Sequence, residues 1–257
     1  MRRTAANRAG ERAVGAERAC RPLEPKLDES TRPRVTEFPL STRETPLMLD
    51  GPGGPLEALY LEAPEPKGLA LLCHPNPIQG GTMLNKVVSM LQRCARDAGY
   101  STLRFNYRGV GASFGHSDMG SGEVDDADAA ARWLQARDPE LPLTLFGFSF
   151  GGFVVASLGG RLERRGSAPD HLFMVAPAVM RLEGEHVPPG ECPLTVIQPD
   201  ADEVIDPALV YAWADALGRP HELLKVAECG HFFHGKLTEL KELVLPRLRP
   251  VSTSDNP

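Results

Sequence analysis

The chain has 257 residues, of which 42% are hydrophobic and 24% are charged, so it is long enough for one large globular domain. Its 28 Lys and Arg against 34 Asp and Glu give a net charge of -6, which argues against nucleic acid as the main partner because phosphate binding needs clustered basic side chains. No apolar run approaches the roughly 18 residues of a membrane-spanning helix, and no apolar signal-peptide core follows the N-terminus. We therefore expect a cytoplasmic protein with no membrane partner.

The two ends of the chain differ in composition from its middle. Residues 1–35 hold nine Lys and Arg against five Asp and Glu and hardly a large apolar side chain, so they cannot bury enough surface to fold alone. We predict a disordered basic arm over 1–35, one folded domain over 36–249 and a frayed tail over 250–257.

Between these ends, apolar strand patterns alternate with amphipathic helix patterns. The predicted strands are 56–63, 68–74, 101–107, 141–147, 171–177, 193–199 and 221–227, and the predicted helices are 85–100, 123–137 with Ser121 as N-cap, 150–160, 207–218 and 232–247. This alternation predicts an α/β fold with a mostly parallel central sheet, helices on both faces and no cap domain. Ligands of such a fold bind at the carboxyl ends of the strands, so the chemistry is expected in the loops that follow them.

The sequence Gly147-Phe148-Ser149-Phe150-Gly151 lies directly between a predicted strand and a predicted helix. A serine there sits on a tight, strained turn, and small residues two positions before and after it let strand and helix approach closely. The N–H of Phe150 at the helix N-terminus is left unpaired and can hold the oxyanion of a tetrahedral intermediate. In this context we predict Ser149 to be a nucleophile, although G-x-S-x-G also occurs by chance in glycine-rich turns.

A nucleophilic serine needs a base to take its proton. His231, in the loop after the predicted strand at 221–227, is the candidate base. It could instead pair with a backbone group at a helix N-terminus, or form an HxxH metal pair with His234. We discount the metal because no further His, Cys or carboxylate cluster completes a site, and the five scattered cysteines contain no CxxC pair. The sequence thus predicts no metal and no cofactor.

Three aspartates in the loop after the strand at 193–199 are candidates for the acid that orients the base. Asp206 precedes Pro207 and a predicted helix, so helix capping explains it without catalysis. Asp200 is close to the end of the strand. Asp202 is far enough into the loop to turn back toward His231, and we favour it, with Asp206 as the alternative.

With these residues in place, the chain from about 44 to 248 resembles the α/β-hydrolase superfamily, in particular its small cap-less members similar to dienelactone hydrolases and serine esterases. The resemblance rests on His74-Pro75-Asn76-Pro77, Gly80-Gly81-Thr82-Met83, Asn85-Lys86, Phe105-Asn106-Tyr107-Arg108-Gly109-Val110-Gly111, the turn at Ser149, Asp202-Glu203-Val204-Ile205 and Gly230-His231-Phe232-Phe233. It implies Ser149 as nucleophile, Asp202 as acid and His231 as base, with the N–H of Asn76 as a second oxyanion donor beside that of Phe150. Dienelactone hydrolases proper carry cysteine in place of Ser149, which argues against that activity here.

The prediction is therefore a serine hydrolase that works through an acyl-enzyme, as a carboxylesterase on small acyl esters. An amidase or thioesterase with the same triad, or a non-enzymatic small-molecule binder on the hydrolase fold, are the alternatives. The expected partner is a small-molecule acyl substrate. We predict apolar lining of its pocket by Ile78, Phe148, Phe150 and Phe232.

Two further residues are assigned supporting roles. His74 closes a strand before Pro75 and is expected to tie the loop through a ring hydrogen bond. Arg108 could meet a substrate carboxylate, but an ion pair with Glu123 or Asp126 is the preferred interpretation.

Overall fold

The computed structural model describes residues 43–184 and 186–248. The predicted arm over 1–35 and tail over 250–257 lie outside these residues, as do the outer limits of the predicted domain. Within the described ranges, no helix is both long enough and apolar enough to span a membrane.

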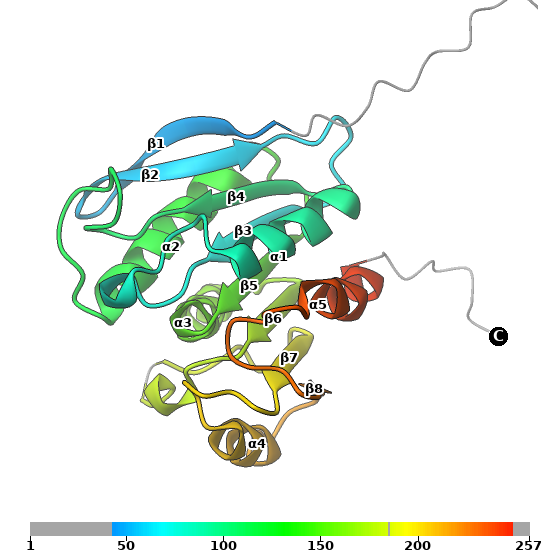
Figure 1. Cartoon of the computed structure of the whole chain (residues 1–257). Helices are drawn as coiled ribbons and strands as arrows, with labels where there is room; N and C mark the ends of the chain where they lie inside the picture. Colours follow the sequence, from blue (N-terminus) through cyan, green and yellow to red (C-terminus); the bar gives the residue numbers. More distant parts are fainter. Residues whose placement is uncertain (1–42, 185, 249–257) are drawn as a thin grey trace, which may run out of the picture. The chain divides into compact units, whose positions relative to one another are not determined.

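One mixed β-sheet forms the centre of the fold (Figure 1). In spatial order its strands are β1 (Thr45–Gly51), β2 (Gly54–Leu61), β4 (Ser101–Phe105), β3 (Leu69–Cys73), β5 (Leu143–Phe148), β6 (His171–Val175), β7 (Leu194–Pro199) and β8 (Glu222–Val226). The pairs β1–β2 and β2–β4 are antiparallel, and all other neighbours are parallel. The predicted α/β fold with a mostly parallel sheet is confirmed.

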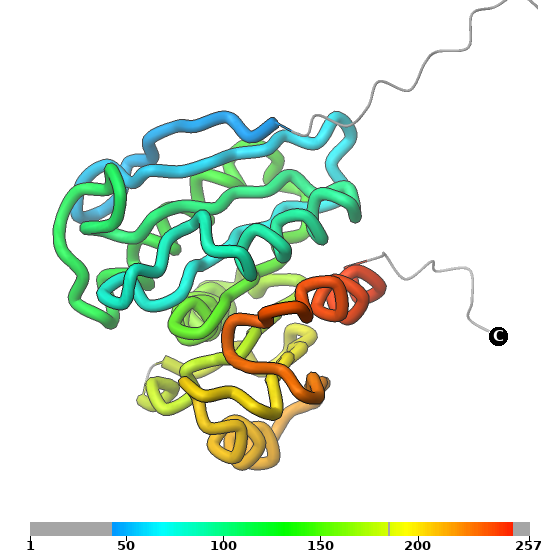
Figure 2. The backbone as a smooth tube through the Cα atoms, viewed as in Figure 1, coloured from blue at the N-terminus to red at the C-terminus, as the bar shows by residue number. Residues whose placement is uncertain are grey.

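Helices cover both faces of this sheet. They are α1 (Lys86–Asp97), α2 (Ser121–Gln135), α3 (Phe150–Arg164), α4 (Pro207–Asp215) and α5 (Leu237–Val244), with short 3-10 turns η2 (Pro77–Gln79), η3 (Val179–Arg181) and η4 (Leu245–Leu248). Buried side chains of α2, α3 and α4 belong to one apolar cluster, and those of α1 and α5 belong to a second one on the other face. Figure 2 shows the C-terminal segment, with α5, returning beside α1.

Strand β3 shows why the sequence produces two buried faces. All five of its residues are buried, and successive side chains point to opposite faces of a strand. Leu69 and Leu71 therefore enter the cluster under α2 and α3, whereas Ala70 and Leu72 enter the cluster under α1 and α5. A continuous apolar run is what a parallel strand covered by helices on both sides requires.

Three details of the sequence prediction are wrong. Strand β1 was not predicted, because it lies at the edge of the sheet and buries only Leu49. Helix α2 begins at Ser121 itself, and its N-cap is Gly120, whose N–H donates to Glu123 Oε2 at 2.9 Å. Helix α5 begins at Leu237 instead of 232, because Phe233 and Gly235 have positive φ angles of 53° and 72°.

Candidate active site

Ser149 lies between the end of β5 and the start of α3, in a sparsely populated region of backbone conformation. Its φ of 57° and ψ of -117° are strained for any residue with a Cβ. The flanking glycines are required by space: a Cβ on Gly147 would lie 2.1 Å from the carbonyl oxygen of Gly151, and a Cβ on Gly151 would lie 2.2 Å from that of Cys73. The strand and helix therefore meet closely enough to hold Ser149 in its strained turn.

His231 lies between Ser149 and Asp202. The three residues follow three different strands, β5 for Ser149, β7 for Asp202 and β8 for His231. Its Nε2 lies 3.0 Å from Ser149 Oγ, and its Nδ1 lies 2.8 Å from Asp202 Oδ2 and 3.0 Å from Oδ1. All three residues are largely buried, with exposures of 6% for Ser149, 8% for Asp202 and 1% for His231. The structure thus brings together the three residues that the sequence analysis selected, although 82 positions separate Ser149 from His231.

The carboxylate of Asp202 is held by more than the imidazole. Its Oδ1 accepts the backbone N–H groups of Val204 at 2.9 Å and Ile205 at 2.8 Å, and its Oδ2 accepts Gln198 Nε2 at 3.1 Å. Burial by itself raises the pKa of Asp202, but the hydrogen bonds from His231 and from these N–H groups outweigh burial and bring the pKa below its usual value. A carboxylate so held fixes the proton of His231 on Nδ1 and leaves Nε2 free to accept from Ser149.

Asp206, the alternative acid, has a different task. Its side chain accepts the N–H of Ala208 at 2.9 Å at the start of α4, where Pro207 is the first helical residue. This is the helix cap that the sequence predicts.

The N–H groups of Asn76 and Phe150 follow the ends of two neighbouring parallel strands, β3 and β5. Cys73 of β3 pairs with Gly147 of β5, and each donor comes three residues after its member of that pair. Among the described residues, neither N–H donates to a backbone or side-chain acceptor. Asn76 also uses its side chain, which accepts the N–H of Ile78 at 2.9 Å and begins η2.

His74 anchors the loop that carries Asn76. Its Nδ1 lies 2.7 Å from the carbonyl oxygen of Pro75, and its Nε2 accepts the N–H of Tyr107 at 3.1 Å, as expected of a structural ring. Burial lowers the pKa of His74 to about 3, against the smaller opposing effect of its hydrogen bond to Pro75. The ring is therefore neutral at physiological pH and keeps one donor and one acceptor in use.

Comparison with known proteins places this geometry in a family. A solved α/β serine hydrolase without a lid, from Xanthomonas campestris, is 39% identical, with 84% of this chain and 98% of that chain covered and a TM-score of 0.74. The chain belongs to the α/β-hydrolase superfamily. The family model of serine aminopeptidases, S33, matches residues 80–189 of this hydrolase.

Two curated relatives add to this picture. An uncharacterized protein of Rickettsia prowazekii is 32% identical to the hydrolase over 208 residues, which cover 77% of this chain and 86% of the relative. A lysophosphatidylserine lipase of Xenopus tropicalis is 36% identical over 87 residues, which cover 34% of this chain and 22% of the relative.

Two residues of the site were not found from the sequence. Glu203 accepts the backbone N–H of His231 at 3.0 Å, and a Cβ on Gly230 would lie 2.7 Å from the same carboxylate oxygen. Gln198, at the end of β7, donates to Asp202. A buried amide residue near the end of a largely apolar parallel strand is the signal that could have indicated Gln198.

The structure corrects part of the predicted pocket. Phe148 and Phe150 are fully or almost fully buried, so they do not line a pocket open to substrate. The ring of Phe148 packs against that of His231, with centroids 5.0 Å apart, and so supports the histidine. Ile78 and Phe232 are 71% and 42% exposed, in the loops after β3 and β8, and both remain candidates for substrate contact.

Arg108 forms the ion pair that the sequence analysis preferred. Its Nη2 lies 2.7 Å from Asp126 Oδ1, and its Nε lies 2.9 Å from Oδ2. The guanidinium is thereby engaged in a bidentate contact with a buried carboxylate.

Proposed function

We propose that this hydrolase is a serine carboxylesterase that acts on small acyl esters through a triad of Ser149, His231 and Asp202. The observation that carries the proposal is the continuous chain of short contacts from Asp202 through both ring nitrogens of His231 to Ser149 Oγ. A protein that only binds a ligand has no need of a serine held in strained backbone geometry beside an oriented imidazole.

In the acylation step, Ser149 Oγ attacks the ester carbonyl while His231 Nε2 takes the hydroxyl proton. The resulting imidazolium is stabilised by the carboxylate of Asp202, which stays ionised because its pKa is low. The carbon–oxygen bond to the alcohol then breaks, and His231 returns the proton to the leaving alkoxide. A water deprotonated by the same nitrogen attacks the acyl-enzyme, releases the acid and restores Ser149.

The negative charge that develops on the carbonyl oxygen needs donors that are already in position. We assign this role to the N–H groups of Phe150 and Asn76, which lie beyond the paired ends of β5 and β3 and have no acceptor among the described residues. One such donor is typically worth about 10²–10³ in kcat.

The nucleophile is tested with a fluorophosphonate probe, which reacts covalently with activated serines. We expect the wild type and a Ser167→Ala control to be labelled, because Ser167 is an exposed serine after α3, and Ser149→Ala not to be labelled. No labelling of the wild type, or equal labelling of Ser149→Ala, would overturn the proposed triad.

The bond that is cleaved is tested with matched substrates. Turnover of p-nitrophenyl esters from acetate to palmitate measures acyl chain length, and the corresponding p-nitroanilides test amide hydrolysis. The family model describes aminopeptidases, whereas a partial relative is a lipase, so these two arms separate the possibilities. We expect a preference for esters over amides. The ratio of turnover of a short p-nitrophenyl ester to that of its p-nitroanilide should exceed the ratio of their uncatalysed hydrolysis rates.

A further inference from the structure

A cavity of about 290 Å³ is lined in part by Phe232, the residue after His231, and plays no part in the mechanism above. We call it the Lys86 cavity, and its lining residues are Gly80, Thr82, Leu84, Asn85, Lys86, Val87, Phe232 and His234. Part of this set is the Gly80–Lys86 segment, which the sequence analysis quoted but to which it gave no role. The volume is at the lower end of the range for small-molecule sites and suits a compact chemical group.

Each of the two walls of the Lys86 cavity is connected along the chain to a residue of the proposed active site, Asn76 or His231. One wall is the loop that begins at Asn76 and runs through η2 to the start of α1. The other wall is the segment directly after His231, and the ring of Phe232 meets the ring of His231 edge-on with centroids 5.0 Å apart. Phe232 therefore both lines the cavity and contacts the imidazole that returns a proton to the departing alcohol.

The first wall is held in place by buried hydrogen bonds. The N–H of Met83 donates to Asn106 Oδ1 at 2.8 Å, and Arg104 Nη1 donates to the carbonyl oxygen of Met83 at 3.0 Å. Asn85 caps α1 by accepting the N–H of Val87 at 2.8 Å. The position of Lys86 in the first turn of this helix is thus defined before any ligand binds.

The second wall owes its shape to one strained residue. Phe233 is fully buried with a φ of 53°, and its N–H donates to the carbonyl oxygen of Gly230. Because this turn takes Phe233 inward, its neighbours Phe232 and His234 are both exposed and line the cavity.

The ionisable side chains of the cavity lining are all basic. It contains two basic side chains, Lys86 and His234, and no aspartate or glutamate among the described residues that form it. Both basic side chains are exposed, and Leu84 and Phe232 add apolar surface at 61% and 42% exposure. Such a lining favours a small group that combines an anion with some apolar surface.

We propose that the Lys86 cavity binds the alcohol portion of the ester, and that Lys86 and His234 select alcohols that carry a carboxylate or phosphate. This inference rests on the proposed esterase function. The leaving oxygen must lie near His231 Nε2 to receive its proton. We place the rest of the alcohol along Phe232 and His234, which line the cavity. The ammonium of Lys86 and a ring N–H of His234 then donate to the anion.

The test compares matched esters that differ in charge. 4-Carboxyphenyl butyrate and 4-carbamoylphenyl butyrate have nearly the same shape, but only the first is anionic. A second pair, the butyryl monoesters of glycerol 3-phosphate and of glycerol, distinguishes phosphate from carboxylate. The measured quantity is the ratio of kcat/KM for the anionic ester to kcat/KM for its neutral partner.

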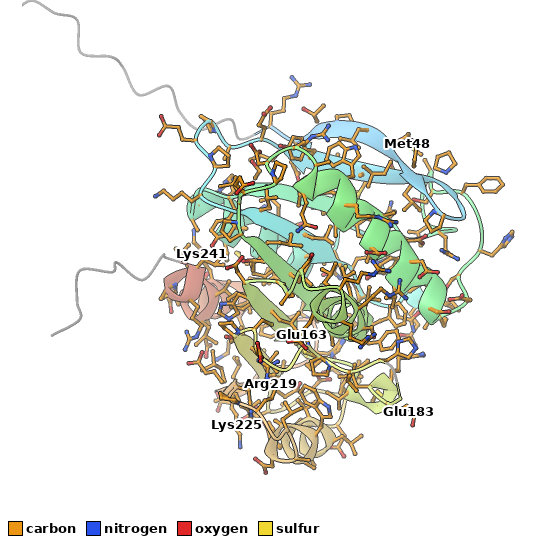
Figure 3. The ribbon with its side chains drawn as sticks, turned by 180° about the vertical axis from the view of Figure 1, so that it is seen from behind. Met48, Glu163, Glu183, Arg219, Lys225 and Lys241 are labelled. Atoms are coloured by element: carbon orange, nitrogen blue, oxygen red, sulfur yellow. The ribbon has the colours of Figure 1, made fainter. Side chains whose placement is uncertain are left out.

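In the wild type we expect the anionic ester of each pair to have a lower KM than its neutral partner. Lys86→Met and His234→Leu should each lower the ratio about two- to fivefold, the range expected of exposed contacts to an anion, and added salt should lower it further. Lys225→Met is the matched control, since it removes the same charge from β8 (Figure 3). In the wild type, Lys225 Nζ lies 3.9 Å from the centroid of the Tyr211 ring. The control should leave the ratio at the wild-type value.

Other outcomes overturn the inference in distinguishable ways. An unchanged ratio in both cavity variants, or an equal change in Lys225→Met, would refute a role for the Lys86 cavity while leaving the esterase intact. Preference for an anion placed in the acyl portion, tested with 4-nitrophenyl hemisuccinate against 4-nitrophenyl butyrate, would refute the assignment to the alcohol. Absence of both ester turnover and fluorophosphonate labelling would refute the proposed function, and this inference with it.

Discussion

Replacing Asp202 by asparagine changes one atom of the site and should reverse the protonation of the base. The asparagine can keep its Oδ1 as acceptor for the N–H groups of Val204 and Ile205, which places its NH₂ group opposite His231 Nδ1. That nitrogen must then accept, so the proton moves to Nε2, and Nε2 can no longer take the proton of Ser149.

The size of the effect follows from this tautomer. The corresponding substitution in serine proteases lowers kcat by on the order of 10⁴, which equals about 5 kcal/mol of transition-state stabilisation. The fold should survive, because Gln198 Oε1 has no partner among the described residues and can turn to accept the new NH₂ group. Hydrogen bonds to a neutral acceptor are weaker than those to a carboxylate, so the free energy of unfolding should fall by about 1–2 kcal/mol at neutral pH.

The assay is kcat on a short p-nitrophenyl ester, with urea unfolding to measure stability. Asp206→Asn is the control, since asparagine caps α4 about as well as aspartate and should keep nearly full activity. Because the folded state lowers the pKa of Asp202, the stability gap between wild type and Asp202→Asn should close as pH falls below about 4. An inactive Asp206→Asn beside an active Asp202→Asn would refute the assignment of the acid.

Substitutions at three other positions, His74, Gly151 and Glu203, test the supports of the site. His74 stays neutral in the folded chain with a pKa of about 3, whereas an unfolded histidine titrates near 6.5, so wild-type stability is lost as pH falls between these values. The advantage of the wild type over His74→Gln in urea unfolding should shrink by about 2 kcal/mol from pH 7 to pH 5, and a constant gap would contradict this. Gly151→Ala places a Cβ 2.2 Å from a backbone oxygen of β3 and should cost about 1–3 kcal/mol and slow fluorophosphonate labelling at least about tenfold, whereas Gly218→Ala, with open space around it, should do neither. Glu203→Ala removes the acceptor of the His231 N–H and should lower kcat/KM about tenfold, and Glu203→Gln should restore most of it; equal losses in both variants would argue for a role of the charge itself.

Local patterns in the sequence were sufficient to select the three residues that the structure brings together in the proposed triad. Ser149 could be found because its turn needs glycines at fixed positions, and the strands before it and before His231 are apolar runs that a parallel sheet must bury. The position of Asp202 along its loop, with Asp206 explained by Pro207, was also visible. These features depend on neighbours in the chain, and the structure brings them together as predicted.

Other features depended on contacts that local pattern does not contain. Phe148 has the pattern of any buried residue in an apolar strand. Nothing near it in the chain shows that its ring packs against the ring of His231. Glu203 resembles an exposed loop carboxylate until the loop after β8 comes within 3.0 Å of it. Strand β1 pairs with β2 through its backbone while exposing most of its side chains, so its sequence lacks the apolar run that identified the other strands.

The strained backbone of Ser149 sets stability against activity at a single position. Glycine relieves most of the conformational strain at a positive φ, about 1–3 kcal/mol, and loses about 0.5–1 kcal/mol to the greater freedom of the unfolded chain. Ser149→Gly should therefore unfold at higher temperature than the wild type while lacking the proposed nucleophile. A screen of random variants for heat resistance alone would enrich this inactive substitution, so directed evolution of this hydrolase must select for turnover at every round.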